Sequence, residues 1–230
     1  MMRRLFNYVF SLALCMTGWA WAGAYEDGLL AYMLGDYAKA SSHFIEAAEG
    51  GSPWGQAMLA EMYDEGKGLP SNKEEAARWY RKAAEQGNAV AQNNLGVAYA
   101  KGRGVARNDQ EAVSWYRRAA DQGYDEAQYN LATMYYCGQG LPKSANEALK
   151  WYRRAAEQGL AVAQYNLGVM YFKGDGAPID LPEAYFWWLL ADAAGDEDAR
   201  QNLEVVAGQL AGGQLAAAQQ RAAKWKRKLP

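Results

Sequence analysis

Aromatic and small apolar residues recur along this chain at a fixed interval of 36 residues. The clearest copy reads Trp115-Tyr116, then Ala119-Ala120, then Gly123. Equivalent copies, the last of them altered, begin at Trp79, Trp151 and Trp187. Spacings of three and four residues place the tyrosine and the alanines on one face of a helix. We therefore predict a helix in each copy, and a constant period of this size is typical of stacked helical repeats.

An earlier helix is predicted in each period from a leucine that is followed four residues later by a tyrosine. These pairs are Leu59 and Tyr63, Leu95 and Tyr99, Leu131 and Tyr135, and Leu167 and Tyr171. Two glycines follow each pair, at Gly66 and Gly68, Gly102 and Gly104, Gly138 and Gly140, and Gly174 and Gly176. Because glycine readily takes the left-handed conformation that ends a helix, we interpret these glycines as turns between two helices.

The start of each second helix carries a strong capping signal. A short polar residue is followed three positions later by a glutamate in every period. These pairs are Asn72 and Glu75, Asn108 and Glu111, Ser144 and Glu147, and Asp180 and Glu183. This spacing predicts a reciprocal capping box, in which the first side chain accepts from the helix amides and the glutamate bonds back to the amide of the capping residue.

Together these patterns predict an all-α chain of antiparallel helix pairs. Four full units are expected at residues 52–87, 88–123, 124–159 and 160–195. A divergent first tetratricopeptide-like unit is expected at 25–51, and a C-terminal helical cap at 196–230. Threonine occurs only at 17 and 133 and isoleucine only at 45 and 179, so the composition favours helix over strand. A single helix pair cannot bury its apolar face alone, so neighbouring units must stack.

Residues 1–24 are predicted to form a secretory signal peptide. Arg3 and Arg4 precede an apolar run from Leu5 to Met16, and small residues suit cleavage near residue 22 or 24. The alternative is a membrane anchor, but polar residues interrupt the run, which is shorter than the roughly 20 apolar residues needed to span a bilayer. We therefore expect the mature protein to be periplasmic or secreted.

Composition narrows the possible chemistry. The chain has 24 basic and 26 acidic residues, and two of the basic ones leave with the signal, so nucleic acid is not an expected partner. Cleavage also removes Cys15, which leaves Cys137 alone and excludes an internal disulfide. His43, the only histidine, lies 36 residues before Trp79 and is expected to pack in the tryptophan position. Without a second histidine, paired cysteines or a nucleophile beside a base, we expect no enzyme activity, no metal site and no cofactor.

The recurring positions also indicate a family. Over roughly residues 52 to 195 the chain resembles the Sel-1-like repeat, a relative of the tetratricopeptide repeat. The resemblance is carried by Leu95-Gly96, Tyr99, Gly102-x-Gly104-Val105, Asn108, Ala112, Trp115-Tyr116-x-x-Ala119-Ala120 and Gly123. It implies a right-handed solenoid of antiparallel helix pairs whose first helices line a concave surface for proteins or peptides. Exported bacterial members are similar to adaptor subunits of envelope machinery.

The resemblance leaves two functions to compare. One branch of the family has a cysteine pair in every repeat and is associated with binding or hydrolysing penicillin-like compounds. This chain departs from that pattern because it has Cys137 alone. We therefore expect an exported, non-catalytic scaffold or adaptor that binds a protein or peptide partner in the cell envelope. The alternative is an envelope enzyme or binding protein for penicillin-like or cell-wall compounds.

One face of the predicted first helices is not explained by packing and is our candidate binding site. Asparagines recur on it at Asn94, Asn130, Asn166 and Asn202. Met134 and Met170, four residues after two of these asparagines, are expected on the same stripe. A neighbouring row becomes aromatic in the later repeats, at Tyr129, Tyr136, Tyr165 and Phe172. An amide offers both a donor and an acceptor, so an asparagine ladder can hold the backbone of an extended peptide while the aromatic row gives selectivity.

Three questions stay open at the level of sequence. Each asparagine could instead bond a carbonyl of the adjacent repeat and so fix the stacking. Cys137 could be exposed on the stripe or buried. The basic C-terminal tail could contact anionic lipid or an acidic partner, or be a solvated helix end of the kind that favours cations. The tail residues are Arg221, Lys224, Lys226, Arg227 and Lys228.

Overall fold

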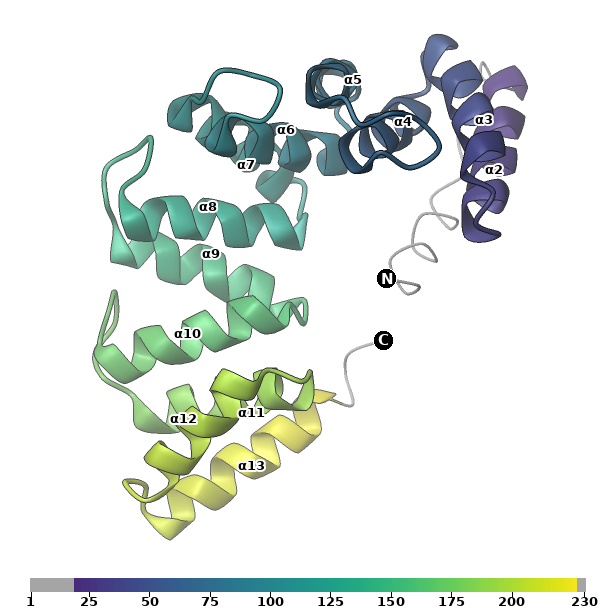
Figure 1. The fold of residues 1–230 in the computed structure, drawn as a ribbon. Coiled ribbons are helices and arrows are strands. Elements are labelled where there is room, and N and C mark those ends of the chain that lie inside the picture. The colour runs from purple at the N-terminus through teal and green to yellow at the C-terminus, as the bar shows by residue number, and fades with distance from the viewer. Residues whose placement is uncertain (1–18, 227–230) are drawn as a thin grey trace. The chain divides into compact units, whose positions relative to one another are not determined.

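The protein is a chain of helices in the computed structural model, which describes residues 19–226 (Figure 1). Every regular element in this range is an α-helix. The helices are α2 (Trp19–Met33), α3 (Tyr37–Glu49), α4 (Pro53–Glu65), α5 (Lys73–Glu85), α6 (Ala89–Lys101), α7 (Asp109–Asp121), α8 (Asp125–Cys137), α9 (Ala145–Glu157), α10 (Ala161–Lys173), α11 (Leu181–Ala193), α12 (Glu197–Ala207) and α13 (Gly212–Lys226). The predicted class, an all-α solenoid of helix pairs, is confirmed. No helix in the described range has the length and apolar character that a membrane span requires.

The chain divides into two compact units, at residues 1–83 and 84–230. In the N-terminal unit α2 packs on α3 and α3 on α4. The predicted signal peptide falls mostly on residues 1–18, outside the described residues. Its predicted cleavage points, near 22 and 24, fall within α2, where Ala24 and Tyr25 are buried. His43 is half-buried on α3.

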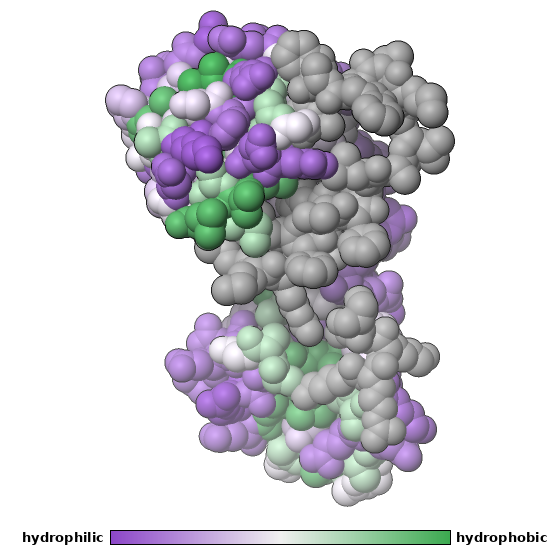
Figure 2. Space-filling view, turned by 90° about the vertical axis from the view of Figure 1, so that its right-hand side faces the viewer, coloured by the Kyte–Doolittle hydropathy of each residue, from purple (hydrophilic) through white to green (hydrophobic). Residues whose placement is uncertain are grey.

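The outer surface of the N-terminal unit is not uniformly polar. The upper part of Figure 2, where this unit faces the viewer, shows hydrophobic residues among hydrophilic ones. Leu30, Met33 and Leu34, at the end of α2, are 58%, 64% and 76% exposed. Their spacing of three and four residues places them on one face of the helix.

The C-terminal unit is built from consecutive pairs. First helices α6, α8 and α10 each pack on the second helix that follows them, α7, α9 and α11. Each second helix from α7 to α11 also packs on the next first helix, which makes the stack continuous. Small residues allow these helices to approach closely: a Cβ on Gly96 would lie 2.7 Å from the Tyr116 ring. The ring therefore fills the space that a side chain on the first helix would occupy.

Both glycines of each turn are needed, for different reasons. Gly138 ends α8 with a φ of 73°, a left-handed conformation that glycine adopts without strain. The second glycine is also left-handed, with a φ of 70° at Gly140, and it lies in addition against the preceding pair. A Cβ on Gly140 would come 2.3 Å from the backbone oxygen of Asp109, and one on Gly176 would come 2.5 Å from that of Ala145. The second glycine thus lets each turn rest on the first residue of the previous second helix.

The predicted capping residues are confirmed, but the reciprocal half of the capping box is wrong. The side chains of Asn108, Ser144 and Asp180 accept from backbone amides in the first turn of α7, α9 and α11. The amide of the capping residue donates to a backbone carbonyl and not to the glutamate. These bonds join Asn72 to Tyr63, Asn108 to Tyr99, Ser144 to Tyr135 and Asp180 to Tyr171, at 2.9 to 3.0 Å. The last turn of the first helix is close enough to satisfy this amide, so the glutamate side chain is released for ion pairs.

The last helix pair differs from the others because α13 covers it. On the outer face of the earlier second helices an arginine stacks on each tryptophan, with Arg118 4.5 Å from the Trp115 ring and Arg154 4.4 Å from the Trp151 ring. The equivalent position on α11 is Leu190, which is buried. Trp225 of α13 packs edge-on against Trp187 at 5.7 Å and takes the place of the cation.

Other residues of the predicted cap also face inward. Ala218 and Ala222 are buried, and Leu215 and Trp225 pack against the same core. Phe186 on α11 is fully buried, whereas the equivalent Ser114 and Lys150 are exposed. The apolar outer face of α11 is thus matched to α13 as a terminal cap, which repeat arrays require to end in a polar surface.

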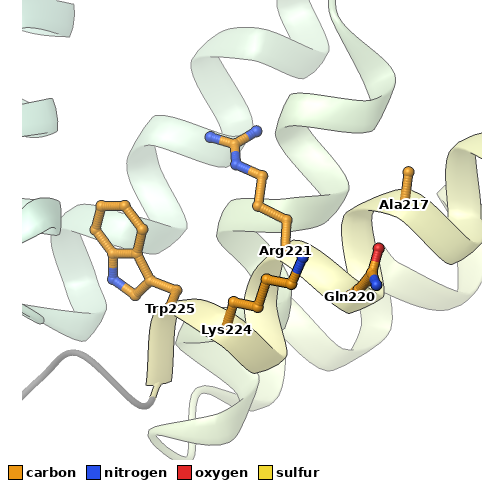
Figure 3. Close-up of a pocket in the computed structure, with 5 residues that line it drawn as sticks. All are labelled: Ala217, Gln220, Arg221, Lys224 and Trp225. Carbon is orange, nitrogen blue, oxygen red and sulfur yellow. The ribbon is translucent and has the colours of Figure 1, made fainter.

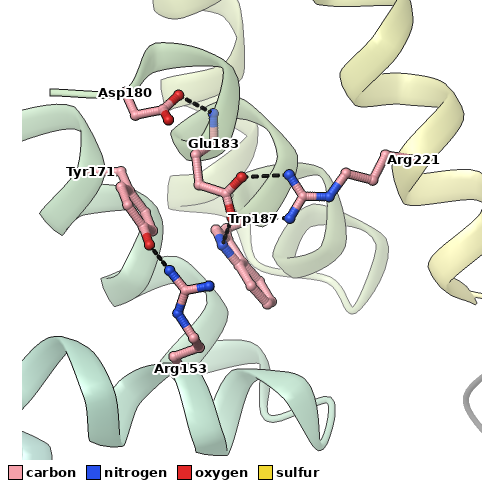
Figure 4. A network of polar contacts seen from close by, with 6 residues as sticks. All are labelled: Arg153, Tyr171, Asp180, Glu183, Trp187 and Arg221. Carbon is pink, nitrogen blue, oxygen red and sulfur yellow. Dashed lines mark hydrogen bonds and ion pairs between the residues drawn. The ribbon is translucent and has the colours of Figure 1, made fainter. Parts of the chain in front are cut away.

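A polar network fastens α13 to α11 (Figure 4). Glu183 accepts hydrogen bonds from both terminal nitrogens of Arg221, one at 3.0 Å, and from the Trp187 indole at 2.8 Å. Burial raises the pKa of the Glu183 carboxyl, but the bonds and charge of Arg221 outweigh it and hold the pKa below its usual range. Nearby, Arg153 of α9 donates to the Tyr171 hydroxyl of α10.

A ladder of glutamines links the pairs and was not part of the prediction. Gln92, Gln128 and Gln164 are buried, and each donates to a carbonyl near the end of the preceding second helix at 3.0 to 3.2 Å. Gln56 makes the same bond in the N-terminal unit. The Oε1 atoms of two of these residues accept from a second glutamine 30 residues later, at the end of the same unit. Those bonds run from Gln122 to Gln92 at 2.7 Å and from Gln158 to Gln128 at 2.8 Å.

The ladder ends unsatisfied at Gln164. Ala194 is the residue 36 positions after Gln158, and its side chain has no hydrogen-bond donor. The Oε1 atom of Gln164 is accordingly buried without a hydrogen-bond partner. The backbone is not the obstacle, because Ala194 has a φ of −91° and Gln158 a φ of −84°.

We predict that Ala194→Gln stabilises the protein by about 1 kcal/mol, the usual net value of one hydrogen bond, by donating to Gln164. Thermal unfolding followed by circular dichroism should show a Tm raised by roughly 2–4 °C. Ala193→Gln, at the exposed neighbouring position, is the matched control and should leave the Tm unchanged. An equal rise in both variants would assign the gain to the helix end and not to the ladder.

We also predict that Glu183→Gln destabilises the protein at pH 7 by about 1 kcal/mol, because it removes the charge that faces Arg221. The pKa of Glu183 is lower in the folded than in the unfolded chain. Its contribution is therefore fully present above the unfolded value, about 4.3, and is lost as the pH falls through the folded value.

The measurement is urea unfolding of the wild type and of Glu183→Gln between pH 7 and pH 3. The stability gap between the two proteins should close on acidification. Glu111→Gln is the control, since Glu111 holds the equivalent position on α7 and has no ion pair among the described residues. A gap for Glu183→Gln that stays constant with pH would contradict the assignment.

Candidate protein-binding face

The nine predicted site residues lie on three successive first helices of the C-terminal unit. Helix α6 carries Asn94; α8 carries Tyr129, Asn130, Met134 and Tyr136; and α10 carries Tyr165, Asn166, Met170 and Phe172. All three asparagines and all four aromatic residues are half-buried. We call these seven residues the first-helix face.

Met134 and Met170 do not belong to this face, and their predicted placement is wrong. They are 4% and 2% exposed and pack in the core. A step of four residues turns a helix by about 40° beyond one full turn, which carries these side chains from the surface stripe into the core. The residue three positions after Asn130 is Thr133, which is half-buried beside the stripe.

The asparagines are bonded in two different ways. The Asn130 Nδ2 group donates to Oδ1 of Asn93 on α6 at 2.8 Å, so it links two repeats. The Asn166 Nδ2 group donates to the Val162 carbonyl of its own helix at 2.8 Å. The structural alternative, a bond that ties the asparagine to the adjacent repeat, is found for Asn130 through the side-chain carbonyl of Asn93 and is not found for Asn166. The Oδ1 atoms of Asn130 and Asn166 accept no hydrogen bond from the described residues.

The aromatic residues are held from beneath by the second helices. The Tyr129 ring lies 5.6 Å from the Tyr152 ring, and the Tyr152 hydroxyl bonds Oγ1 of Thr133 at 2.9 Å. Burial raises the pKa of Tyr152 well above its usual range, so this hydroxyl is neutral at any physiological pH. These contacts fix the Tyr129 ring while one edge of it stays at the surface.

One repeat later Trp188 takes the position of Tyr152, and its ring contacts Phe172, the equivalent of Tyr136. The Phe172 ring lies 5.7 Å from the Trp188 ring, and the Trp188 indole donates to the Tyr165 carbonyl at 3.1 Å. Trp188 itself is fully buried. Two adjacent repeats thus present rigid, half-exposed rings, which lose little conformational entropy when a partner binds.

Tyr136 is anchored across the repeat boundary. Its hydroxyl donates to Oδ2 of Asp175, in the turn after α10, at 2.8 Å. The bond and charge of Asp175 raise the pKa of Tyr136, so the phenol stays protonated. Lys143 lies over the same ring, with Nζ 5.8 Å from the centroid. The next residue along α8, Cys137, is exposed, which answers the question left open by the sequence.

Apolar residues that the sequence argument missed add to this surface. Val162, four residues before Asn166, is 38% exposed, and Val205, three residues after Asn202, is 61% exposed. Their spacing from the asparagines was the available signal, because four residues back and three residues forward both turn the helix to the opposite side of the stripe from Met134 and Met170. In the range 19–226 no three histidine, cysteine or acidic side chains gather in a geometry that would hold a metal ion.

A separate pocket lies against α13 (Figure 3). It has a volume of about 300 Å³ and is lined on α13 by Ala217, Gln220, Arg221, Lys224 and Trp225. The Arg221 guanidinium is already committed, since it binds Glu183 and lies 3.7 Å from the centre of the Phe186 ring. The predicted contact of the basic tail with lipid or an acidic partner stays a prediction, and residues 227–230 lie outside the described residues.

Stacked helix pairs with rigid rings along their first helices define a helical-repeat solenoid. The model of the Sel1 repeat matches residues 11–52, 55–88, 89–124, 125–160 and 161–196, and the chain belongs to the Sel1 repeat family. Proteins of this family are generally protein-interaction scaffolds. No protein with curated annotation matches the chain.

Solved structures agree with this assignment. A Sel1 repeat protein from Oxalobacter formigenes is 34% identical, with 87% of this chain and 82% of that chain covered and a TM-score of 0.76. The protective antigen c5321 of uropathogenic Escherichia coli is 32% identical, with 90% of this chain covered and a TM-score of 0.78. The match spans only 45% of the length of c5321. The immunity protein Pa5087 of Pseudomonas aeruginosa, 21% identical, covers 81% of this chain and 69% of that one and shares the fold with a TM-score of 0.52.

We predict that the two asparagines differ in their structural contribution. Asn130→Ala removes the partner of Asn93, which is only 3% exposed, and should destabilise the protein by about 1–2 kcal/mol because a buried acceptor is left unpaired. Asn166→Ala loses only a bond within its own helix and should change stability by less than about 0.5 kcal/mol. Urea unfolding of both variants tests this, and equal losses would refute the difference.

Proposed function

We propose that this protein is an exported, non-catalytic scaffold that binds a protein or peptide partner of the cell envelope on the first-helix face. The single observation that carries the proposal is the set of half-exposed aromatic rings, three of which, Tyr129, Tyr136 and Phe172, are held in place by contacts from other helices or turns. Rigid aromatic side chains with one free edge are the groups that most often dominate binding energy in protein interfaces. The predicted signal peptide supports the envelope location.

The polar groups on the face suit a protein partner. The Oδ1 atoms of Asn130 and Asn166 accept no hydrogen bond from the described residues, so each can accept one from a partner's N–H group. The face itself carries no charged side chain among its seven residues. Depletion of charge at the centre, with aromatic residues enriched, is the composition of an interface core.

The test is co-purification from the native envelope with a variant that blocks the face. Asn166→Lys places a cation beside Tyr165 and should reduce recovery of the partner at least tenfold, because a charge would be buried in the interface without a counterion. Ser114→Lys, an exposed position on the outer side of α7, is the matched control and should leave recovery unchanged. Equal recovery by the two variants, both folded by circular dichroism, would rule out this face.

A further inference from the structure

Exposed cations are concentrated along the edge of the C-terminal unit where the first helices end. Lys101 and Lys173 are the last residues of α6 and α10. Arg103 lies between the two glycines of the first turn, and Lys143 lies in the next turn, one residue before the cap of α9. All four side chains are exposed, and none has an ion pair among the described residues. We call these four residues the basic edge.

Acidic residues near the same turns do not neutralise the basic edge. Three of the acidic side chains at the start of the second helices are already paired. These pairs are Asp109 with Arg107, Glu147 with Lys150, and Glu183 with Arg221. Asp175 accepts from the Tyr136 hydroxyl and Asp180 caps α11, and neither these two carboxylates nor Glu111 has an ion pair among the described residues. Four unpaired cations therefore stand on a chain whose formal net charge is −2.

Cations near the glycine turn of the N-terminal unit are engaged in ion pairs. Lys67, which lies between two turn glycines as Arg103 does, pairs with Glu65 at 2.6 Å. Near the same turn Lys73, which corresponds to Asp109 and not to a residue of the basic edge, pairs with Asp64 at 2.8 Å. The attraction of a helix end for cations accounts for Lys101 and Lys173, but not for Arg103 and Lys143, which belong to turns. The unpaired charges of the turns thus need a different explanation.

The basic edge is continuous with the first-helix face. Lys143 lies over the ring of Tyr136, a residue of that face. Lys173 follows Phe172 directly, and Lys101 is seven residues, or about two helical turns, after Asn94. A partner lying on the aromatic rings therefore meets cations on the side of the glycine turns.

We propose that the first-helix face binds a peptide segment that combines aromatic or aliphatic side chains with acidic ones, whose carboxylates lie against the basic edge. This inference rests on the proposed function and adds the chemistry of the partner. The apolar side chains contact the rings, and the carboxylates supply the charge that Arg103 and Lys143 lack within the chain. Such charge pairing mainly raises the association rate and selects against basic partners, and it adds less to the affinity itself.

The experiment selects peptides from a phage-displayed random library on the immobilised full chain, at about 50 mM salt so that screening is weak. Selected sequences should be enriched in aspartate and glutamate next to aromatic or aliphatic residues. A fluorescein-labelled synthetic copy of one selected peptide then serves as the probe for titrations with variants.

Arg103→Glu with Lys143→Glu should raise the Kd of the probe at least tenfold. The matched control, Lys39→Glu with Lys150→Glu, changes the net charge equally at two other exposed lysines and should change the Kd less than twofold. Raising the salt to about 300 mM should weaken binding to the wild type, because the paired charges are screened, and should not weaken binding to the Arg103→Glu, Lys143→Glu variant, which lacks those pairs.

The outcomes separate this inference from the proposed function. Peptides whose binding is lost in Asn166→Lys, but which lack acidic residues or bind Arg103→Glu, Lys143→Glu normally, would overturn the acidic partner and keep the binding face. Selected peptides that all bind Asn166→Lys normally would overturn both. Equal weakening by the two charge-reversal variants would show a general effect of net charge and also overturn the role of the basic edge.

Discussion

The register between helix pairs depends on side-chain hydrogen bonds to carbonyl groups at the buried end of each second helix. The next pair in the stack covers these helix ends, where the last carbonyls have no partner within the helix. Gln92, Gln128 and Gln164 of the following first helix each donate to one such carbonyl, which also accepts from a glycine amide after the helix, while Gln122 and Gln158 in turn donate to two of those side chains. Each pair is therefore fixed in register to the one before it, and the apolar contacts between pairs are made at positions that these bonds define.

Much of this architecture could be predicted from the sequence because its signals are local. The turn glycines and the capping residues Asn108, Ser144 and Asp180 act within a few residues of themselves, so their spacing set the helix boundaries. The glutamate half of the capping box failed because a carbonyl from the previous helix reaches the same amide first. The glutamine ladder had the required period, but a glutamine in a helix usually faces solvent, and only tertiary packing reveals that these are buried.

The candidate site was predicted less completely, and for a geometric reason. Asparagine and tyrosine positions were correctly expected at the surface of the first helices, whereas Met134 turned out to be core. The difference between a three-residue and a four-residue step decides which side of the stripe a side chain occupies. Bonds between repeats, such as that from Asn130 to Asn93, depend on how far one helix is shifted along the next, which the period does not specify.

The contrast between α11 and the earlier second helices has a consequence for how such an array changes in length. Phe186 and Leu190 of α11 are buried, whereas the equivalent positions on α7 and α9 are exposed, so another unit placed after α11 would not meet the polar outer face that the earlier second helices present. A duplicated copy of the α8–α9 unit inserted between α7 and α10 would keep every hydrogen bond of the glutamine ladder. Recombination can therefore add or remove units in the middle of the array, but not at its C-terminal end.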